Sequence, residues 1–150
     1  MFERFESFAS YRDLAELLPL SETDSAFVAQ SRNAIIDSLF GDTGKLVLFI
    51  GPCSVHNSEA ILAYASWLKT QQKAFGDKIL FVMRTYVEKS RTDIGWRGLA
   101  RQPDPLLPED TEAGIKKARG ILLEITKCEL PCAVEIVHPL LWTYWHDLIS

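Results

Sequence analysis

Two short, uninterrupted apolar segments, residues 46–50 and 79–83, constrain the fold of this 150-residue chain more than any other feature. Each is bounded by polar residues or glycine, which is typical of a strand buried on both faces of a parallel sheet. A third segment of similar character, residues 132–137, follows Pro131. Because apolar residues at helical spacing lie between these segments, we expect β-α units with right-handed crossovers and a parallel sheet.

Helices are predicted where apolar residues recur at intervals of three and four. They are residues 25–40, a segment from the cap Asn57 or Ser58 to about Phe75, a segment that begins at the cap Thr111, and residues 140–149. The first 24 residues are expected to form an arm, because Pro19 interrupts any helix that precedes it. The chain therefore divides into an N-terminal arm and helix over residues 1–44 and three β-α units over residues 45–150.

Composition excludes several classes of protein. The 47% apolar and 24% charged residues are typical of a globular α/β domain with one compact core. A formal net charge of −4 disfavours nucleic-acid binding, which needs a surplus of Lys and Arg. No apolar run approaches the ~18 residues of a membrane helix, and the first residues lack a secretory signal. We therefore expect a cytoplasmic protein with reduced cysteines and no nucleic-acid or membrane partner.

Positive charge is concentrated in one long polar connection, residues 84–101. Its cations are Arg84, Lys89, Arg91, Arg97 and Arg101, and its acids are Glu88 and Asp93. These five cations and two acids give the segment a net charge of +3. Since the whole chain has a net charge of −4, the other residues together carry −7. Arginine holds carboxylate or phosphate bidentately and lysine acts as a movable charge and proton donor, so the segment suits phosphorylated acids. A solvated basic loop is the alternative interpretation.

Two further polar residues belong to predicted strands or their ends. Cys53 directly follows the first strand, where a thiolate can bind a metal or act as a nucleophile, although a lone cysteine is most often an inert apolar residue. His56 completes a Cys-x-x-His pair, but a zinc site needs three or four ligands and no second pair follows. Glu135 lies within the third predicted strand. We expect it to pair with a cation of the basic segment or to face solvent on an edge strand.

Three motifs follow the first two predicted strands in a distinctive order. They are Gly51-Pro52-Cys53-Ser54-Val55-His56, Met83-Arg84-Thr85-Tyr86-Val87-Glu88-Lys89-Ser90-Arg91-Thr92 and Gly95-Trp96-Arg97-Gly98-Leu99. With these motifs the chain resembles the type I 3-deoxy-7-phosphoheptulonate (DAHP) synthases from about Leu17 to its last residues. The resemblance implies an incomplete (β/α)8 TIM barrel. It also implies condensation of phosphoenolpyruvate with erythrose 4-phosphate, the first step of the shikimate pathway to aromatic amino acids.

The resemblance implies roles for individual residues. Cys53 matches a ligand of a divalent metal such as manganese or iron, which polarises the aldehyde under attack. The residues that match substrate-binding positions are Arg84, Lys89, Arg91, Thr92, Arg97 and Glu135. Of these, Arg84 matches a contact to phosphoenolpyruvate, and Lys89 matches the catalytic lysine between the two substrates. Arg91 and Thr92 match the groups that hold the phosphate of the aldose.

The chain departs from the family pattern in several residues and in length. Ser90 stands where the family usually has Pro, and Val134 and His138 replace a Gly and an acidic residue. Eight β-α units take about 250 residues, so the family's other metal ligands, a His, a Glu and an Asp, would follow Ser150. We therefore expect the chain alone to be inactive. Its open sheet edge predicts a homo-oligomer or association with a full-length copy.

Two other interpretations of the chain are open. A non-catalytic module derived from the enzyme would keep anion binding or serve in assembly. An unrelated phosphate-binding domain would instead have a self-contained, flavodoxin-like arrangement of three layers.

Overall fold

The computed structural model describes residues 8–91 and 94–150, and its strands form one parallel sheet in the order β1-β2-β3. The strands are β1 (Leu46–Ile50), β2 (Ile79–Arg84) and β3 (Cys132–Ala133). β1 pairs along its full length with β2, and β3 pairs with Met83 and Arg84 at the end of β2. The predicted parallel sheet is confirmed, and the carboxyl ends of the three strands meet at one edge.

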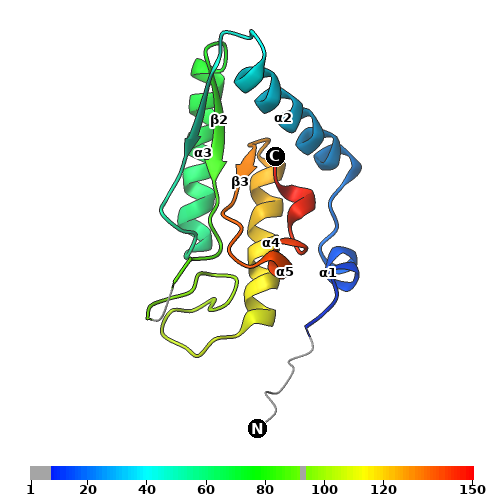
Figure 1. Cartoon of the computed structure of the whole chain (residues 1–150), viewed down its shortest axis with the longest axis vertical. Helices are drawn as coiled ribbons and strands as arrows, with labels where there is room; N and C mark the ends of the chain where they lie inside the picture. The colour runs from blue at the N-terminus through cyan, green and yellow to red at the C-terminus, as the bar shows by residue number, and fades with distance from the viewer. Residues whose placement is uncertain (1–7, 92–93) are drawn as a thin grey trace.

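The described residues also form helices. They are α1 (Tyr11–Leu17), α2 (Glu22–Phe40), α3 (Ser58–Phe75), α4 (Thr111–Lys127), α5 (Pro139–Trp142) and the 3-10 helix η1 (His146–Leu148). Asn57 caps α3 as predicted, whereas Asp110 instead of Thr111 caps α4. In Figure 1 the long connection from β2 to α4, green to yellow, lies at the opposite end of the molecule from the turn that joins α2 to β1. None of the helices over residues 8–91 and 94–150 is long and apolar enough to cross a bilayer.

The core lies between the sheet and the helices α3 and α4. Leu68 of α3, Met83 of β2 and Leu122 of α4 have no exposed surface. Each fully buried large apolar side chain contributes about 1.5–3 kcal/mol, so this layer is a main source of stability. Trp145 and Leu148 from the C-terminal segment join the same cluster. The packed layer holds the strand ends, and the segments that follow them start from fixed positions.

The N-terminal region contains more helix than the sequence analysis predicted. α1 lies inside the expected arm, where the side chains of Ser10 and Asp13 each accept the other's backbone N–H in a capping box. α2 begins at Glu22 and not at Ser25, because the Ser21 side chain accepts a backbone N–H from the first turn. In both cases a serine followed three residues later by an aspartate is the signal in the sequence.

The prediction that the first strand is buried on both faces is wrong. Leu46 is 62% exposed and Phe49 is 51% exposed. Within the described part of the chain β1 pairs with β2 alone, so its other edge is open. An apolar strand at an open edge is a surface that another polypeptide can cover.

The third strand is shorter than predicted and ends at Ala133. The placement of Glu135 inside that strand is therefore wrong. Ala133 pairs with Arg84, the last residue of β2. The ladder stops here because β2 itself ends at Arg84. Further along, the backbone N–H of His138 donates to the Glu88 carboxylate at 3.5 Å.

The predicted final helix over residues 140–149 is divided into α5 and η1. Arginine side chains from two other helices bind backbone carbonyls in this region. Arg119 of α4 donates to the Tyr144 carbonyl, and Arg32 of α2 donates to the carbonyls of His146 and Ile149. These contacts hold the segment in a compact, irregular path that a continuous helix would not follow.

Candidate functional site

The carboxyl ends of β1 and β2 bring the first two motifs together. Gly51 directly follows β1 and lies close to the backbone of β2. A Cβ on Gly51 would lie 2.4 Å from the Arg84 carbonyl oxygen. The Arg84 Nε donates to the Pro52 carbonyl at 3.1 Å, which ties the two segments side by side. The Arg84 guanidinium also lies over the Tyr86 ring, with its carbon 4.7 Å from the ring centroid. Backbone packing and an arginine therefore fix the position of Cys53.

Lys89 and Cys53 form the most specific contact in the site. The Lys89 Nζ donates to the Cys53 sulfur at 2.8 Å and to the carbonyl oxygen of the same residue at 2.8 Å. The hydrogen bond and charge of Lys89 lower the pKa of the exposed Cys53 thiol, and Arg84 and Arg91 add smaller effects. The thiol therefore ionises at a lower pH than an isolated cysteine does, and it is accessible from solvent.

The other two cysteines differ from Cys53. Cys132 is fully buried, and burial raises the pKa of its thiol to about 12. It packs in the core as a protonated, apolar side chain. Cys128 caps the end of α4. Cys128 and Cys132 therefore occupy structural positions, unlike the accessible Cys53.

Four cations of the basic segment line a pocket with a volume of about 240 Å³. The lining residues are Glu88, Lys89, Arg91, Arg97, Arg101, Val137 and His138. The backbone folds back on itself here, because the Lys89 N–H donates to the Arg97 carbonyl at 3.0 Å. Gly98 allows this turn with φ of +98°. One carboxylate among four cations makes the pocket a place where an anion would be attracted.

Glu88 is a functional candidate that the sequence analysis counted only as a charge. Its side chain is 2% exposed although it belongs to a strongly polar connection. Burial raises the pKa of its carboxyl, and the backbone N–H of His138 and the charge of Arg101 oppose that rise. An acidic residue next to Lys89 in a cationic segment was the available signal, but its burial depends on the segment after β3.

Arg101 and His138 were also not selected as site residues. Both line the same pocket, and the Nε of Arg101 and the Nδ1 of His138 are buried without a hydrogen-bond partner among the described residues. Arg97 approaches Glu109 at 3.7 Å, with both side chains partly exposed. Such an exposed pair contributes about 0–1 kcal/mol and leaves Arg97 free to reorient.

Glu135 lies near the basic segment, but not in the predicted ion pair. Its Oε1 accepts a hydrogen bond from the Ser90 hydroxyl at 3.3 Å. Among the described residues no cation forms a salt bridge with it. Thr92, the remaining residue matched to the aldose phosphate, lies outside the described residues. Of the predicted site residues, the structure therefore brings together Cys53, Lys89 and the arginines, and Glu135 hydrogen-bonds to a hydroxyl.

The described residues do not form a metal site by themselves. Over residues 8–91 and 94–150 no three His, Cys, Asp or Glu side chains are grouped so that they could hold a metal ion. Cys53 is an accessible thiol with a lowered pKa, which suits a metal ligand. Three or four ligands are needed, so any metal bound here requires donors from elsewhere.

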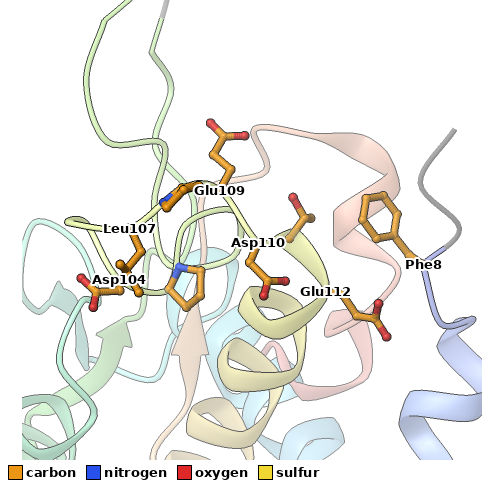
Figure 2. A pocket seen from close by; sticks show the side chains of 9 residues that line it. Phe8, Asp104, Leu107, Glu109, Asp110 and Glu112 are labelled. Atoms are coloured by element: carbon orange, nitrogen blue, oxygen red, sulfur yellow. The ribbon is translucent and has the colours of Figure 1, made fainter. Parts of the chain in front are cut away.

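A larger hollow of about 630 Å³ lies between Phe8 and residues 103–112. Figure 2 shows the carboxylates of Asp104, Glu109, Asp110 and Glu112 along it, with the Phe8 ring beyond Glu112. Its acidic lining is unsuited to phosphorylated acids, because like charges repel. The basic pocket is therefore the better candidate site despite its smaller size.

Comparison with known proteins agrees with the motifs at the strand ends. Residues 21–150 match the sequence profile of the DAHP synthetase I family. The Tyr-sensitive phospho-2-dehydro-3-deoxyheptonate aldolase of Salmonella typhimurium is 40% identical over 137 residues, which cover 91% of this chain and 38% of that protein. A phospho-2-dehydro-3-deoxyheptonate aldolase of Corynebacterium glutamicum is 35% identical over 146 residues, which cover 97% of this chain and 40% of that protein.

A solved structure extends the similarity to three dimensions. The phospho-2-dehydro-3-deoxyheptonate aldolase of Francisella tularensis superposes with a TM-score of 0.94 at 33% identity. The match covers 100% of this chain and 44% of that one. This chain thus spans about two-fifths of the length of the Salmonella and Corynebacterium relatives.

Proposed function

The chain belongs to the DAHP synthetase I family, and on that premise we propose that it forms the anion-binding N-terminal part of a DAHP synthase. The proposed reaction joins phosphoenolpyruvate, erythrose 4-phosphate and water to give 3-deoxy-D-arabino-heptulosonate 7-phosphate and inorganic phosphate. The observation that carries the proposal is the convergence of Cys53, Lys89 and the arginine-lined pocket at one edge of a parallel sheet.

The proposed roles follow from charge and position. Two anionic substrates repel each other, so cations fixed in advance lower the free energy of bringing them together. Arg84, beside the end of β1, would bind phosphoenolpyruvate, and Arg91 with Thr92 would bind the phosphate of the aldose. Arg97 adds positive charge to the pocket that Arg91 lines. Lys89 lines the pocket with Arg91 and Arg97 and reaches Cys53, and it would pass a proton to the aldehyde oxygen as that oxygen gains negative charge.

The remainder of the enzyme would come from polypeptide outside residues 1–150. We propose that β1, β2 and β3 are the first strands of an eight-stranded barrel. Cys53 would be one ligand of a divalent metal whose other donors belong to that polypeptide. The solved relative, which is more than twice as long as this chain, and the open apolar edge of β1 support this assignment.

Ligand binding tests the proposal without requiring turnover. We expect phosphoenolpyruvate and erythrose 4-phosphate, each titrated into the purified chain with a chelator present, to bind with salt-dependent affinity. Arg84→Ala should weaken the binding of phosphoenolpyruvate, and Arg91→Ala should weaken the binding of erythrose 4-phosphate. Each affinity should fall by about tenfold or more, since a charge-assisted hydrogen bond contributes about 1.5–3 kcal/mol. Lys73→Ala, which removes an exposed cation of α3, is the matched control.

Two results would count against the proposal. One is binding that neither arginine variant weakens beyond the Lys73→Ala control. The other is turnover of both substrates by the 150-residue chain with manganese, because that would show that the site needs no further polypeptide.

A further inference from the structure

Lys89 is flanked by two residues whose side chains both reach the same neighbouring segment. Glu88 and Ser90 precede and follow Lys89 in the connection after β2. Their partners, the backbone near His138 and the carboxylate of Glu135, belong to the segment after β3. Side chains therefore join the two segments immediately on either side of the lysine.

The first contact is a buried carboxylate on backbone donors. The Glu88 Oε2 accepts the His138 N–H at 3.5 Å. The neighbouring Val137 N–H also lowers the pKa of this carboxyl. Two charged groups face it, Arg101 from its own connection and Glu135 from the segment after β3. Removing a buried acceptor leaves its donors unsatisfied, so the Glu88 side chain is costly to displace.

The second contact runs in the opposite direction. The Ser90 hydroxyl donates to the Glu135 Oε1 at 3.3 Å, so a carboxylate from the segment after β3 reaches the connection after β2. Ser90 is exposed, and this contact involves its side chain alone. A proline at this position would supply no hydroxyl. The contact is therefore a property of this chain's own residue.

We propose that Glu88 and Ser90 are positioning residues that fasten the segment after β2 to the segment after β3 and so hold the Lys89 ammonium beside Cys53. This inference rests on the proposed function, in which Lys89 acts at that point. A lysine side chain carries about 2 kcal/mol of rotamer entropy. Fixing the backbone on both sides limits the positions from which its four-carbon stem can start.

The ammonium can be located by comparing two reagents that alkylate Cys53. Iodoacetate is an anion and iodoacetamide is neutral, and both react with the thiolate. The rate constant for iodoacetate divided by that for iodoacetamide is independent of how much thiolate is present, and it rises with the local positive potential. We would measure this ratio at one pH, with a chelator present, and identify the Cys53 peptide by mass spectrometry. Lys89→Met should lower the ratio by about fivefold, the effect of one unit charge about 4 Å away in water.

The positioning role predicts that the ratio falls in variants where the change in charge alone would raise it or leave it unchanged. Glu88→Ala removes a negative charge, which alone would raise the ratio, yet loss of positioning should lower it by roughly twofold. Ser90→Ala changes no charge and should lower the ratio similarly, and Ser90→Thr, which keeps the hydroxyl, should restore it. Glu109→Gln is the matched control, because it removes a carboxylate near Arg97 without touching Glu88 or Ser90.

Each outcome decides the inference. A ratio that falls in Ser90→Ala, recovers in Ser90→Thr and does not fall in Glu109→Gln supports it. A ratio that stays at the original value in Ser90→Ala overturns it, and this test remains available if Glu88→Ala does not fold. Equal ratios for the original chain and Lys89→Met also overturn it. The ligand titrations of Arg84→Ala and Arg91→Ala still test the proposed function, so the two failures are distinguishable.

Discussion

The Lys89 ammonium lies 2.8 Å from the sulfur of Cys53, joining the ends of two adjacent strands at the edge where the basic pocket opens. The two residues are 36 positions apart in the chain. Their contact places a cation and an ionisable thiol in one accessible site. Its consequence can be measured in solution without any ligand.

Lys89→Met should move the ionisation of Cys53 to higher pH. The hydrogen bond and charge of Lys89 lower the pKa of that thiol, so their removal returns it toward its ordinary value. The pH dependence of alkylation by iodoacetamide, followed at the Cys53 peptide, measures this change. Lys73→Met serves as the control and should leave the profile in place. An unchanged profile in Lys89→Met would contradict the contact.

Asp147→Asn should destabilise the fold by about 3 kcal/mol or more, because it leaves the buried Arg119 without its charge partner. The guanidinium of Arg119 is fully buried and donates to both carboxylate oxygens of Asp147 at 2.8 Å. Chemical denaturation at neutral pH measures the loss. Glu124→Gln, which breaks the exposed pair with Lys127, should change stability by only about 0.5 kcal/mol. Comparable losses in the two variants would argue against a special role for the buried pair.

The same pair predicts how stability depends on pH. Burial acts to raise the pKa of Asp147, but the hydrogen bonds and charge of Arg119 outweigh it, so the pKa lies below its ordinary value. The resulting stabilisation is present above the unfolded-state pKa of about 3.9 and is lost as pH falls through the folded-state pKa. Unfolding midpoints measured from pH 6 downward should therefore decline less steeply in Asp147→Asn than in the original chain. Parallel curves would refute this.

Gly98→Ala should destabilise the connection after β2, whereas Gly120→Ala should not. At Gly98 the φ is +98° and a Cβ would lie 2.6 Å from the Val87 carbonyl oxygen, which predicts a loss of about 2 kcal/mol or more. At Gly120 a Cβ would meet no atom within 4 Å, and alanine favours a helix over glycine by about 1 kcal/mol. Thermal unfolding of both variants measures the contrast. Equal melting temperatures would show that the turn at Gly98 is not needed.

Phe49→Lys should reduce self-association of the chain. Phe49 is 51% exposed on β1, whose outer edge is unpaired among the described residues, and a lysine there both removes apolar surface and blocks edge pairing. Sedimentation velocity over a range of concentrations measures the assembly. Leu106→Lys, at a residue 92% exposed in the connection before α4, is the control and should leave association unchanged. Equal association of all three proteins would exclude β1 as the contact surface.

Some of the site was predictable because the strands were predictable. The segments 46–50 and 79–83 are continuous apolar runs, and a parallel sheet brings their carboxyl ends to one edge. Cys53 and Lys89 follow from that placement and from the resemblance of the motifs. The roles of these residues in substrate binding stay predictions that the ligand titrations test.

Other parts of the site could not be predicted from one segment at a time. Glu88 looks like a solvated charge in the sequence, and Glu135 looks like a strand residue. In the structure they lie at contacts between segments about fifty residues apart, with partners near His138 and at Ser90. No local pattern specifies which of two acidic residues becomes buried, because burial depends on how both segments leave the sheet.

The amino-acid sequence by itself determined the strand and helix order, since caps and apolar spacing act between residues a few positions apart and are complete within each element. Only the tertiary structure decided where β3 ends, why the last helix is divided and how Lys89 is held. Those outcomes depend on side chains that bind the backbone of distant segments, such as Arg32 on the Ile149 carbonyl across 117 positions. The free energy of such contacts is realised only after packing has brought the segments together.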